Sequence, residues 1–208
     1  MRLRPLGVTE VLRAAIEGIA EAAERKGIRI ERFEPGSDLT VNGDVGRLQQ
    51  IFDNVLSNAV KFTPRGGSIG VTLTRESNQA VARIRDNGVG MAPEFLPLAF
   101  EIFQQQEGGT RRQYGGLGIG LALAKSLTEL HAGTIAAASD GVGRGTEMTI
   151  RLPLLAVEAV ALSSLATPES ALCRLDGPSV LLIEDVEDSR EASRVMLERA
   201  RPGGGRRA

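Results

Sequence analysis

Two asparagines and a lysine stand at helical spacing in one polar stripe of this chain. Asn54 and Asn58 are four residues apart and Lys61 follows three residues later, so the three share one side of a helix with Gln50. Amide oxygens are hard, neutral ligands that Mg²⁺ accepts, and a lysine ammonium neutralises phosphate as a point charge. Asparagine is also a mediocre helix former, which favours a functional role. A solvated polar face opposite a buried stripe explains this helix alone equally well.

Two glycine-containing segments could complete such a site. Asp86 begins DNGVG at the end of an expected strand, where its carboxylate could accept a hydrogen bond from an exocyclic amine. Gly88 and Gly90 would let a flat ring lie against the backbone, although an ordinary turn explains a lone DNGVG better. GGLGIG, residues 115–120, opens a helix whose free N–H groups could face phosphate. A dinucleotide site is not favoured, because this segment does not follow a strand inside a βαβ unit.

The hydrophobic pattern predicts the elements that must position these residues. Asp44 suits the N-cap of the helix that carries the asparagines, and Gly27 suits a left-handed position after the preceding helix. The expected elements are helices over 9–26, 45–62 and from about 117 to a cap at Gly133, short helical pieces over 93–106, and strands over 28–33, 68–75, 79–86, 134–140 and 146–154. This order predicts a two-layer α/β sandwich, with helices on one face of a mixed, mainly antiparallel sheet.

Composition excludes several classes of protein. The chain has 208 residues, 42% apolar and 25% charged, with a formal net charge of −1, so nothing global indicates nucleic acid or an anionic membrane as a partner. No apolar run is long enough for a membrane span, and no secretory signal is evident. The single cysteine, Cys173, allows no internal disulfide and fits a reducing compartment, so we expect a cytoplasmic protein.

Taken together, these segments resemble the ATP-binding catalytic domain of sensor histidine kinases, a Bergerat-fold domain of the GHKL ATPases. The segment DVGRLQQIFDNVLSNAVKFTPRGG is similar to the family's N box, DNGVGM to its G1 box and LAFEIFQQ to its F box. GGLGIGLALAKSLTELHAG is similar to the G2 box with its helix, and GRGTEMTIRLPL to the last glycine box and final strand. The resemblance covers about residues 5–154, and several separate motifs at family-like spacing argue against chance.

The resemblance implies a role for each motif residue. Asn58 would be the main Mg²⁺ ligand, Asn54 would support it, and Lys61 would face the phosphates of ATP. Asp86 would accept from the adenine amine, and Thr146 would line the adenine side. The other residues expected near the nucleotide are Gly88, Gly90, Gly116, Leu117, Gly118, Ile119 and Gly120. A lid would run from about 100 to 117, and Arg111 or Arg112 could reach the γ-phosphate, although for these two a solvated arginine is an equally good interpretation.

The residue at position 54 distinguishes two reactions. Hydrolytic members of the superfamily have a glutamate there, whereas the amide of Asn54 cannot act as a general base. The resemblance therefore implies phosphoryl transfer to a histidine on a separate two-helix dimerisation region, and a response-regulator receiver as a further partner in trans. The one histidine, His131, lies in ELHAG, where the family has a histidine that is not the acceptor. Without dimerisation helices we expect a monomer, with no nucleic acid or membrane contact.

Three alternatives remain at this point. The chain could be a non-enzymatic nucleotide-binding or interaction module that modulates an intact kinase or regulator. It could be a hydrolytic ATPase of the gyrase, mismatch-repair or chaperone kind, against which Asn54 argues. It could also be an anti-sigma-type serine kinase. Transfer of phosphate to a supplied histidine-bearing helix pair separates the first alternative from a kinase.

The C-terminal quarter is expected to be a separate region from the catalytic domain of residues 1–154. Residues 155–177 have no clear period and are expected to form a linker. PSVLLIEDVEDSREASRVMLER, within 178–200, resembles the first strand and helix of a receiver domain, with Glu184 and Asp185 as its acidic pair. Such a short fragment cannot bury a core alone, and we expect a loosely attached remnant followed by a disordered tail over 201–208. The whole chain thus resembles an excerpt of a hybrid sensor kinase.

Overall fold

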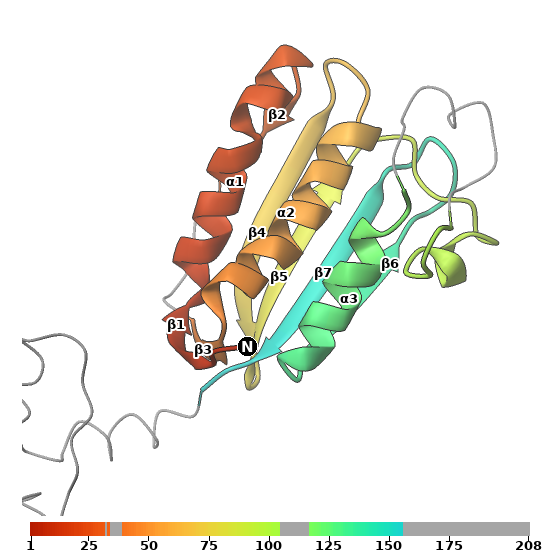
Figure 1. The fold of residues 1–208 in the computed structure, drawn as a ribbon. Coiled ribbons are helices and arrows are strands. Elements are labelled where there is room, and N and C mark those ends of the chain that lie inside the picture. Colours follow the sequence, from red (N-terminus) through yellow and green to blue (C-terminus); the bar gives the residue numbers. More distant parts are fainter. Residues whose placement is uncertain (32, 34–38, 105–116, 156–208) are drawn as a thin grey trace, which may run out of the picture. The chain divides into compact units, whose positions relative to one another are not determined.

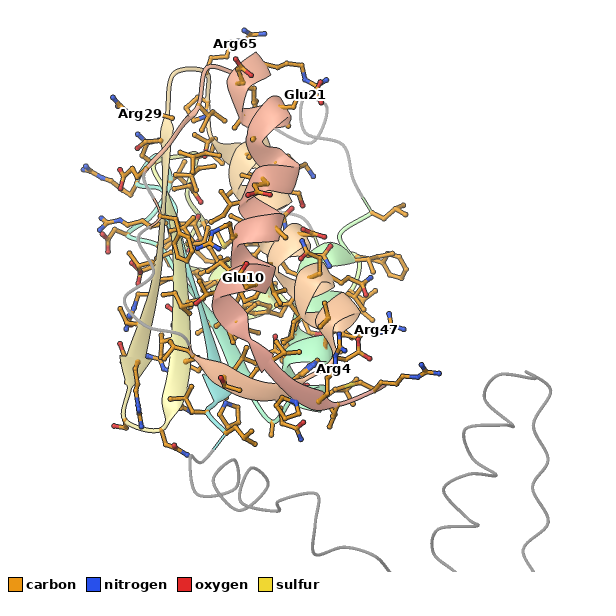
Figure 2. The ribbon with its side chains drawn as sticks, turned by 90° about the vertical axis from the view of Figure 1, so that its left-hand side faces the viewer. Arg4, Glu10, Glu21, Arg29, Arg47 and Arg65 are labelled. Carbon is orange, nitrogen blue, oxygen red and sulfur yellow. The ribbon has the colours of Figure 1, made fainter. Side chains whose placement is uncertain are left out.

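A five-stranded sheet covered on one face by three helices forms the described part of the protein. This computed structural model describes residues 1–31, 33, 39–104 and 117–155. The sheet has the strand order β2-β4-β5-β7-β6, in which β2 runs parallel to β4 and every other neighbouring pair is antiparallel. The three helices lie side by side over one face (Figure 1), and the view turned by 90° shows the strands to the left of the helices (Figure 2). The predicted two-layer α/β sandwich is confirmed.

The elements follow the predicted order, with two additions. The structure contains β1 Arg4–Gly7, α1 Val8–Arg25, β2 Arg29–Ile30, β3 Thr40–Gly43, α2 Val45–Phe62, β4 Ser68–Glu76, β5 Gln79–Asp86, the 3₁₀ helix Leu96–Leu98, α3 Gly120–Leu130, β6 Thr134–Ala138 and β7 Thr146–Pro153. The additions are β1 and β3, which pair antiparallel with each other. These four-residue strands, RPLG and TVNG, lack a period-2 signal because each contains glycine and one contains proline.

Helix α2 packs its predicted apolar stripe into the core. Its N-cap is Asp44, whose carboxylate accepts a hydrogen bond from the Arg47 backbone N–H, as expected for this residue type. The residues of α2 that are buried are Leu48, Ile51, Phe52, Val55, Leu56, Ala59 and Val60. They contact the inward face of the sheet, including Ile69, Ile84 and Ile150, and the apolar side of α1. The opposite, polar side of α2 therefore faces away from the core.

Several element boundaries differ from the prediction. The strand expected over 28–33 is only β2, two residues long, because only Arg29 and Ile30 find partners on β4. Helix α3 begins at Gly120 instead of about residue 117. Its left-handed terminal residue is Ala132, with φ of 56°, whereas Gly133 is required because a Cβ there would lie 2.4 Å from the Arg151 carbonyl oxygen. Gly27, in contrast, has the predicted positive φ of 63°.

The C-terminal quarter lies outside the described residues. The predicted linker of 155–177, the receiver-like segment of 178–200 and the tail of 201–208 fall there, apart from residue 155, and these interpretations stay predictions. Most of the lid expected over 100–117 also falls outside the described residues, as do Arg111, Arg112 and Gly116. No helix among the described residues is long and apolar enough to cross a membrane.

Lys26 joins the end of α1 to the end of α2. Its Nζ donates hydrogen bonds to the backbone carbonyls of Val60, Lys61 and Thr63, each at 2.8 Å. These carbonyls belong to the last turn of α2 and to its C-cap, Thr63, where the helix itself offers no N–H partners. A cation is also favourable at this negative end of the helix dipole. Lys26 therefore fixes the end of the helix that carries the polar stripe.

We predict that Lys26→Met lowers the free energy of unfolding by about 1–3 kcal/mol, because three carbonyls lose a charged hydrogen-bond donor. Urea denaturation measures this change. The matched control is Arg25→Met, since the neighbouring Arg25 makes a solvent-exposed ion pair with Glu21, which is labelled in Figure 2. Such surface pairs contribute under about 1 kcal/mol. Equal losses in the two variants would contradict the capping role of Lys26.

Candidate nucleotide site

The two asparagines of α2 lie against the first turn of α3. Asn54 and Asn58 are half-buried, and Asn54 Nδ2 donates a 2.8 Å hydrogen bond to the Gln50 carbonyl in its own helix. This bond turns Asn54 Oδ1 outward from α2. A Cβ at Gly120 would lie 3.1 Å from Asn54 Oδ1 and 3.9 Å from Asn58 Nδ2. The structure therefore brings both predicted amides to the N-terminus of α3, where backbone N–H groups are free of intrahelical partners.

Lys61 lies on the same side of α2, one turn beyond Asn58. Its ammonium is 4.8 Å from the centroid of the Phe62 ring, a cation–π distance. Partial burial lowers the pKa of Lys61 below its ordinary value. The polar stripe thus presents two amides and one amine from consecutive turns. Amide oxygens with an adjacent amine and helix N–H groups can bind a phosphate chain and its hard cation.

The chemistry of these donors fits Mg²⁺ bound together with phosphate. Among the described residues there is no cluster of three or more His, Cys, Asp or Glu side chains that could form an all-protein cage. Mg²⁺ takes only one or two protein oxygens when phosphates and water complete its octahedron. The outward Asn54 oxygen beside Asn58 supplies a set of that size. The residues present are therefore compatible with this ion.

Asp86 is a buried carboxylate at the end of β5. Only 8% of its surface is exposed, and burial raises the pKa of this carboxyl above its usual 3.8. Hydrogen bonds from the backbone N–H groups of Gly88, at 2.8 Å, and Thr146 act in the opposite direction. Thr146 is itself buried and pairs with Asp86 in the register of β5 with β7. A buried carboxylate held this rigidly can select a ligand that donates a hydrogen bond.

The glycines after Asp86 allow backbones to approach each other closely. The Val89 N–H donates to the Phe62 carbonyl at 3.1 Å, and a Cβ on Gly88 would lie 2.5 Å from that oxygen. Gly90 has a φ of +66°, and a Cβ there would lie 2.1 Å from the Gly141 carbonyl oxygen. These contacts give both glycines a packing role. Room for a purine at these positions stays a prediction.

The segment before α3 contacts residues at the start of the expected lid. Gly118 has a φ of +68°, and its carbonyl accepts a hydrogen bond from the Phe103 N–H at 3.1 Å. Leu117 is 74% exposed and Ile119 is 37% exposed, and neither belongs to the hydrophobic core formed by the described residues.

His131 links the end of α3 to the start of α2. Its ring is 5% exposed, with Nδ1 2.7 Å from the Leu127 carbonyl and Nε2 accepting from the Asp44 N–H at 3.1 Å. A carbonyl accepts only, so Nδ1 carries the proton and Nε2 is the acceptor. Both ring nitrogens are therefore engaged in backbone contacts. That His131 is not a phosphoryl acceptor stays a prediction.

Sequence reasoning predicted the turn between β6 and β7 but missed that this turn packs behind Asp86. Ser139 and the glycines at 141, 143 and 145 form this turn between β6 and β7. A Cβ at Gly145 would lie 2.0 Å from the Asp86 carbonyl oxygen, so the turn is packed directly on the loop of residues 86–91. The run GVGRG was recognisable as a turn, but its partner loop lies far away in the sequence.

Comparison with known proteins agrees with this geometry. Residues 43–156 match the family described as histidine kinase-, DNA gyrase B- and HSP90-like ATPase. The circadian input-output histidine kinase CikA of Synechococcus elongatus is 34% identical over 205 residues, covering 95% of this chain and 25% of that protein. Among solved structures, a mycobacterial sensor histidine kinase, MprB, superposes with a TM-score of 0.64 at 30% identity, covering 73% of this chain and 97% of that one.

A second solved structure is full-length ShkA in complex with AMPPNP. It superposes with a TM-score of 0.64 at 31% identity, covering 74% of this chain and 31% of that one. The chain spans only about a quarter of the length of the curated relatives it matches. The family match, which includes α2, Asp86, α3 and β7, covers the whole described site. The chain therefore belongs to the histidine kinase-, DNA gyrase B- and HSP90-like ATPase family and contains the ATP-binding catalytic domain of a sensor histidine kinase.

Proposed function

We propose that this chain binds ATP with Mg²⁺ and presents the γ-phosphoryl group to a histidine on a separate two-helix dimerisation region. The observation that carries the proposal is the meeting of Asn54 and Asn58 with the N-terminus of α3. A buried carboxylate, Asp86, at the end of β5 would then hold the adenine. The AMPPNP complex of the related ShkA supports a nucleotide at this fold.

Each residue has a defined part in the proposed site. Asp86 would accept a hydrogen bond from the adenine amine, with Thr146 beside it. Asn58, supported by Asn54, would supply amide oxygens to Mg²⁺, which when bound neutralises charge on the phosphate oxygens. Lys61 would add a positive charge on the same side. Gly118 and Gly120, together with Gly116, would bring backbone N–H groups to the phosphates.

The proposed reaction is a transfer, with little hydrolysis. The bond between the γ-phosphorus and the bridging oxygen of ADP breaks, and a bond from the acceptor histidine nitrogen to phosphorus forms. Asn54 cannot take a proton from water, because an amide has no basic site of suitable pKa. Positioning and charge neutralisation supply most of the catalysis in phosphoryl transfer, and α2 and α3 offer both.

The partners belong to the same proposal. A histidine-bearing helix pair would act as the acceptor, and a response-regulator receiver would take the phosphoryl group onward. Arg111 or Arg112 would reach the γ-phosphate from the lid, and a cytoplasmic location would give access to ATP.

Two measurements test the proposal. Calorimetric titration with a non-hydrolysable ATP analogue, with and without Mg²⁺, shows whether the site binds nucleotide. Radiolabelled ATP is then mixed with the chain and a histidine-bearing two-helix protein, with a His→Ala version of that protein as the control. Label on the acceptor only when its histidine is present supports the kinase. Binding without transfer would favour a non-enzymatic nucleotide-binding module, and absence of binding by the folded chain would reject the kinase and favour an interaction module.

A further inference from the structure

Ser139 occupies the junction between the two loops that enclose Asp86. It lies directly after β6 and is half-buried. Its hydroxyl accepts a 3.0 Å hydrogen bond from the Met91 N–H, at the end of the first loop, and a 3.3 Å bond from the Gly141 N–H in the second. It donates to the Gly145 carbonyl at 2.7 Å, which is shorter than its 3.3 Å distance to the Gly141 carbonyl. One hydroxyl thus serves backbone groups of both loops.

This arrangement uses the whole hydrogen-bonding capacity of a serine. A hydroxyl has one proton to donate and two lone pairs to accept with, and Ser139 has a partner for each. A strand that continued to residue 140, as the sequence predicted, would turn this hydroxyl away from its present partners. The strand instead ends at Ala138, where Ser139 begins the turn. The local side-chain contacts therefore favour the turn over further strand pairing.

The contacts of Ser139 fix the loop that carries the buried carboxylate. Two backbone hydrogen bonds also join the loops, from Gly143 N–H to the Val89 carbonyl at 2.7 Å and from Gly145 N–H to the Gly88 carbonyl at 3.1 Å. Ser139 adds the contact at Met91, just past the left-handed Gly90, where the first loop leaves the junction. Both ends of the first loop are thereby tied to the second, since Gly145 packs on Asp86 at the other end.

We propose that Ser139 is a positioning residue for the nucleotide base, acting through the loop of residues 86–91. The inference rests on the proposed function, because it assigns Ser139 to the base-binding end of that site. Binding is tighter when the protein's contact groups are held in place before the ligand arrives. Without the hydroxyl, the loop gains freedom that nucleotide binding must remove. The phosphate-facing residues on α2 do not depend on this contact.

The expected result is a selective loss of affinity in Ser139→Ala. We expect about a 10-fold higher Kd for the non-hydrolysable ATP analogue, and the same factor for ADP, because both share the adenine. The gain in affinity on adding Mg²⁺, and the rate of phosphoryl transfer to a supplied acceptor at saturating ATP, should remain close to those of the wild type. Ser139→Thr, which retains a hydroxyl, should restore most of the affinity. A loss confined to ATP would place the effect at the phosphates and overturn the proposal.

The matched control is Ser126→Ala. Ser126 is an exposed serine whose hydroxyl donates to the Ala122 carbonyl of its own helix at 3.1 Å, with no described contact to either loop. Urea denaturation of both variants separates loss of stability from loss of affinity. If the two variants lose affinity equally, Ser139 has only a structural role and the proposal is wrong.

Hydrogen exchange in the nucleotide-free protein makes the inference testable apart from catalysis. The amides of Met91 and Gly141 should exchange at least about 10-fold faster in Ser139→Ala than in the wild type, because their acceptor is removed. Unchanged exchange at both amides would overturn the loop contact. If the wild type binds no nucleotide, the proposed function fails, and faster exchange would still show that Ser139 holds the loops together.

Discussion

Replacing Asp86 by alanine is expected to weaken ATP binding about 100-fold, the largest effect on affinity that we anticipate. A hydrogen bond to a charged group contributes about 1.5–3 kcal/mol, and its loss also leaves the adenine amine without a partner in a desolvated position. The carboxylate is buried and held by two backbone N–H groups, so water cannot readily replace it. Calorimetric titration with a non-hydrolysable analogue measures the change.

Base selectivity should change in parallel. Adenine presents an amine donor where guanine presents a carbonyl acceptor, so only adenine matches an ionised carboxylate. The wild type should prefer ATP over GTP, and Asp86→Ala should lose this preference. Asp53→Asn is the control, because Asp53 is exposed on α2 and accepts a hydrogen bond from Gln49 in the same helix. If the Asp86→Ala protein is folded and binds the analogue as tightly as the wild type does, Asp86 is not part of the nucleotide site.

Acidification should weaken nucleotide binding earlier than an ordinary aspartate would. Burial raises the pKa of Asp86 above 3.8, so the carboxylate that accepts from adenine is lost at a higher pH. Stability changes with pH in the opposite direction from affinity. The stabilising contribution of Asp86 to the folded state is fully present below pH 3.8, and it is lost as the pH rises through the raised pKa of the folded state.

Asp86→Asn is therefore expected to be at least as stable as the wild type at neutral pH, where the buried charge is unfavourable. Urea denaturation at two pH values checks the sign of this effect. Titration of the analogue over the same range should show a pH-dependent affinity for the wild type, and a much flatter profile for Asp86→Asn. Equal pH profiles for the two proteins would contradict an ionised Asp86 as the base contact.

Asn58→Ala is expected to reduce phosphoryl transfer by about 10²–10³-fold, the second large effect. Removing one preoriented group that stabilises charge in a transition state commonly has this magnitude. Asn58 lies beside Asn54 and the first residue of α3, so its side-chain amide is near the proposed phosphate chain. ATP affinity in the absence of Mg²⁺ should change little, while the gain in affinity on adding Mg²⁺ should be lost.

A control separates this effect from general loss of an amide. Asn78→Ala removes an exposed asparagine in the turn between β4 and β5, far along the hairpin from Asp86. This variant should bind and transfer as the wild type does. If Asn58→Ala retains its full response to Mg²⁺ during titration, the ion is held by other groups and the assignment of Asn58 is wrong.

The sequence predicted those elements whose signals are local. Helix α2 spans Val45–Phe62 as expected, because a capping aspartate, a continuous apolar stripe and a following Pro and Gly pair all lie within it or beside it. The hairpin of β4 and β5 was equally clear from alternation around a short turn. In contrast, β1 and β3 are separated by a whole helix, and their pairing leaves no mark on either segment alone.

The sequence by itself determined which chemical groups the site contains and the order in which they occur. Asn54, Asn58, Lys61 and Asp86 have side chains suited to a cation, a phosphate and a base amine, whatever the fold. Only the tertiary structure decided how these groups meet. Packing of α2 against α3 brings the amides to Gly120, and Ser139 binds Met91 across 48 positions of sequence. Such contacts depend on the paths of distant segments, and no local propensity encodes them.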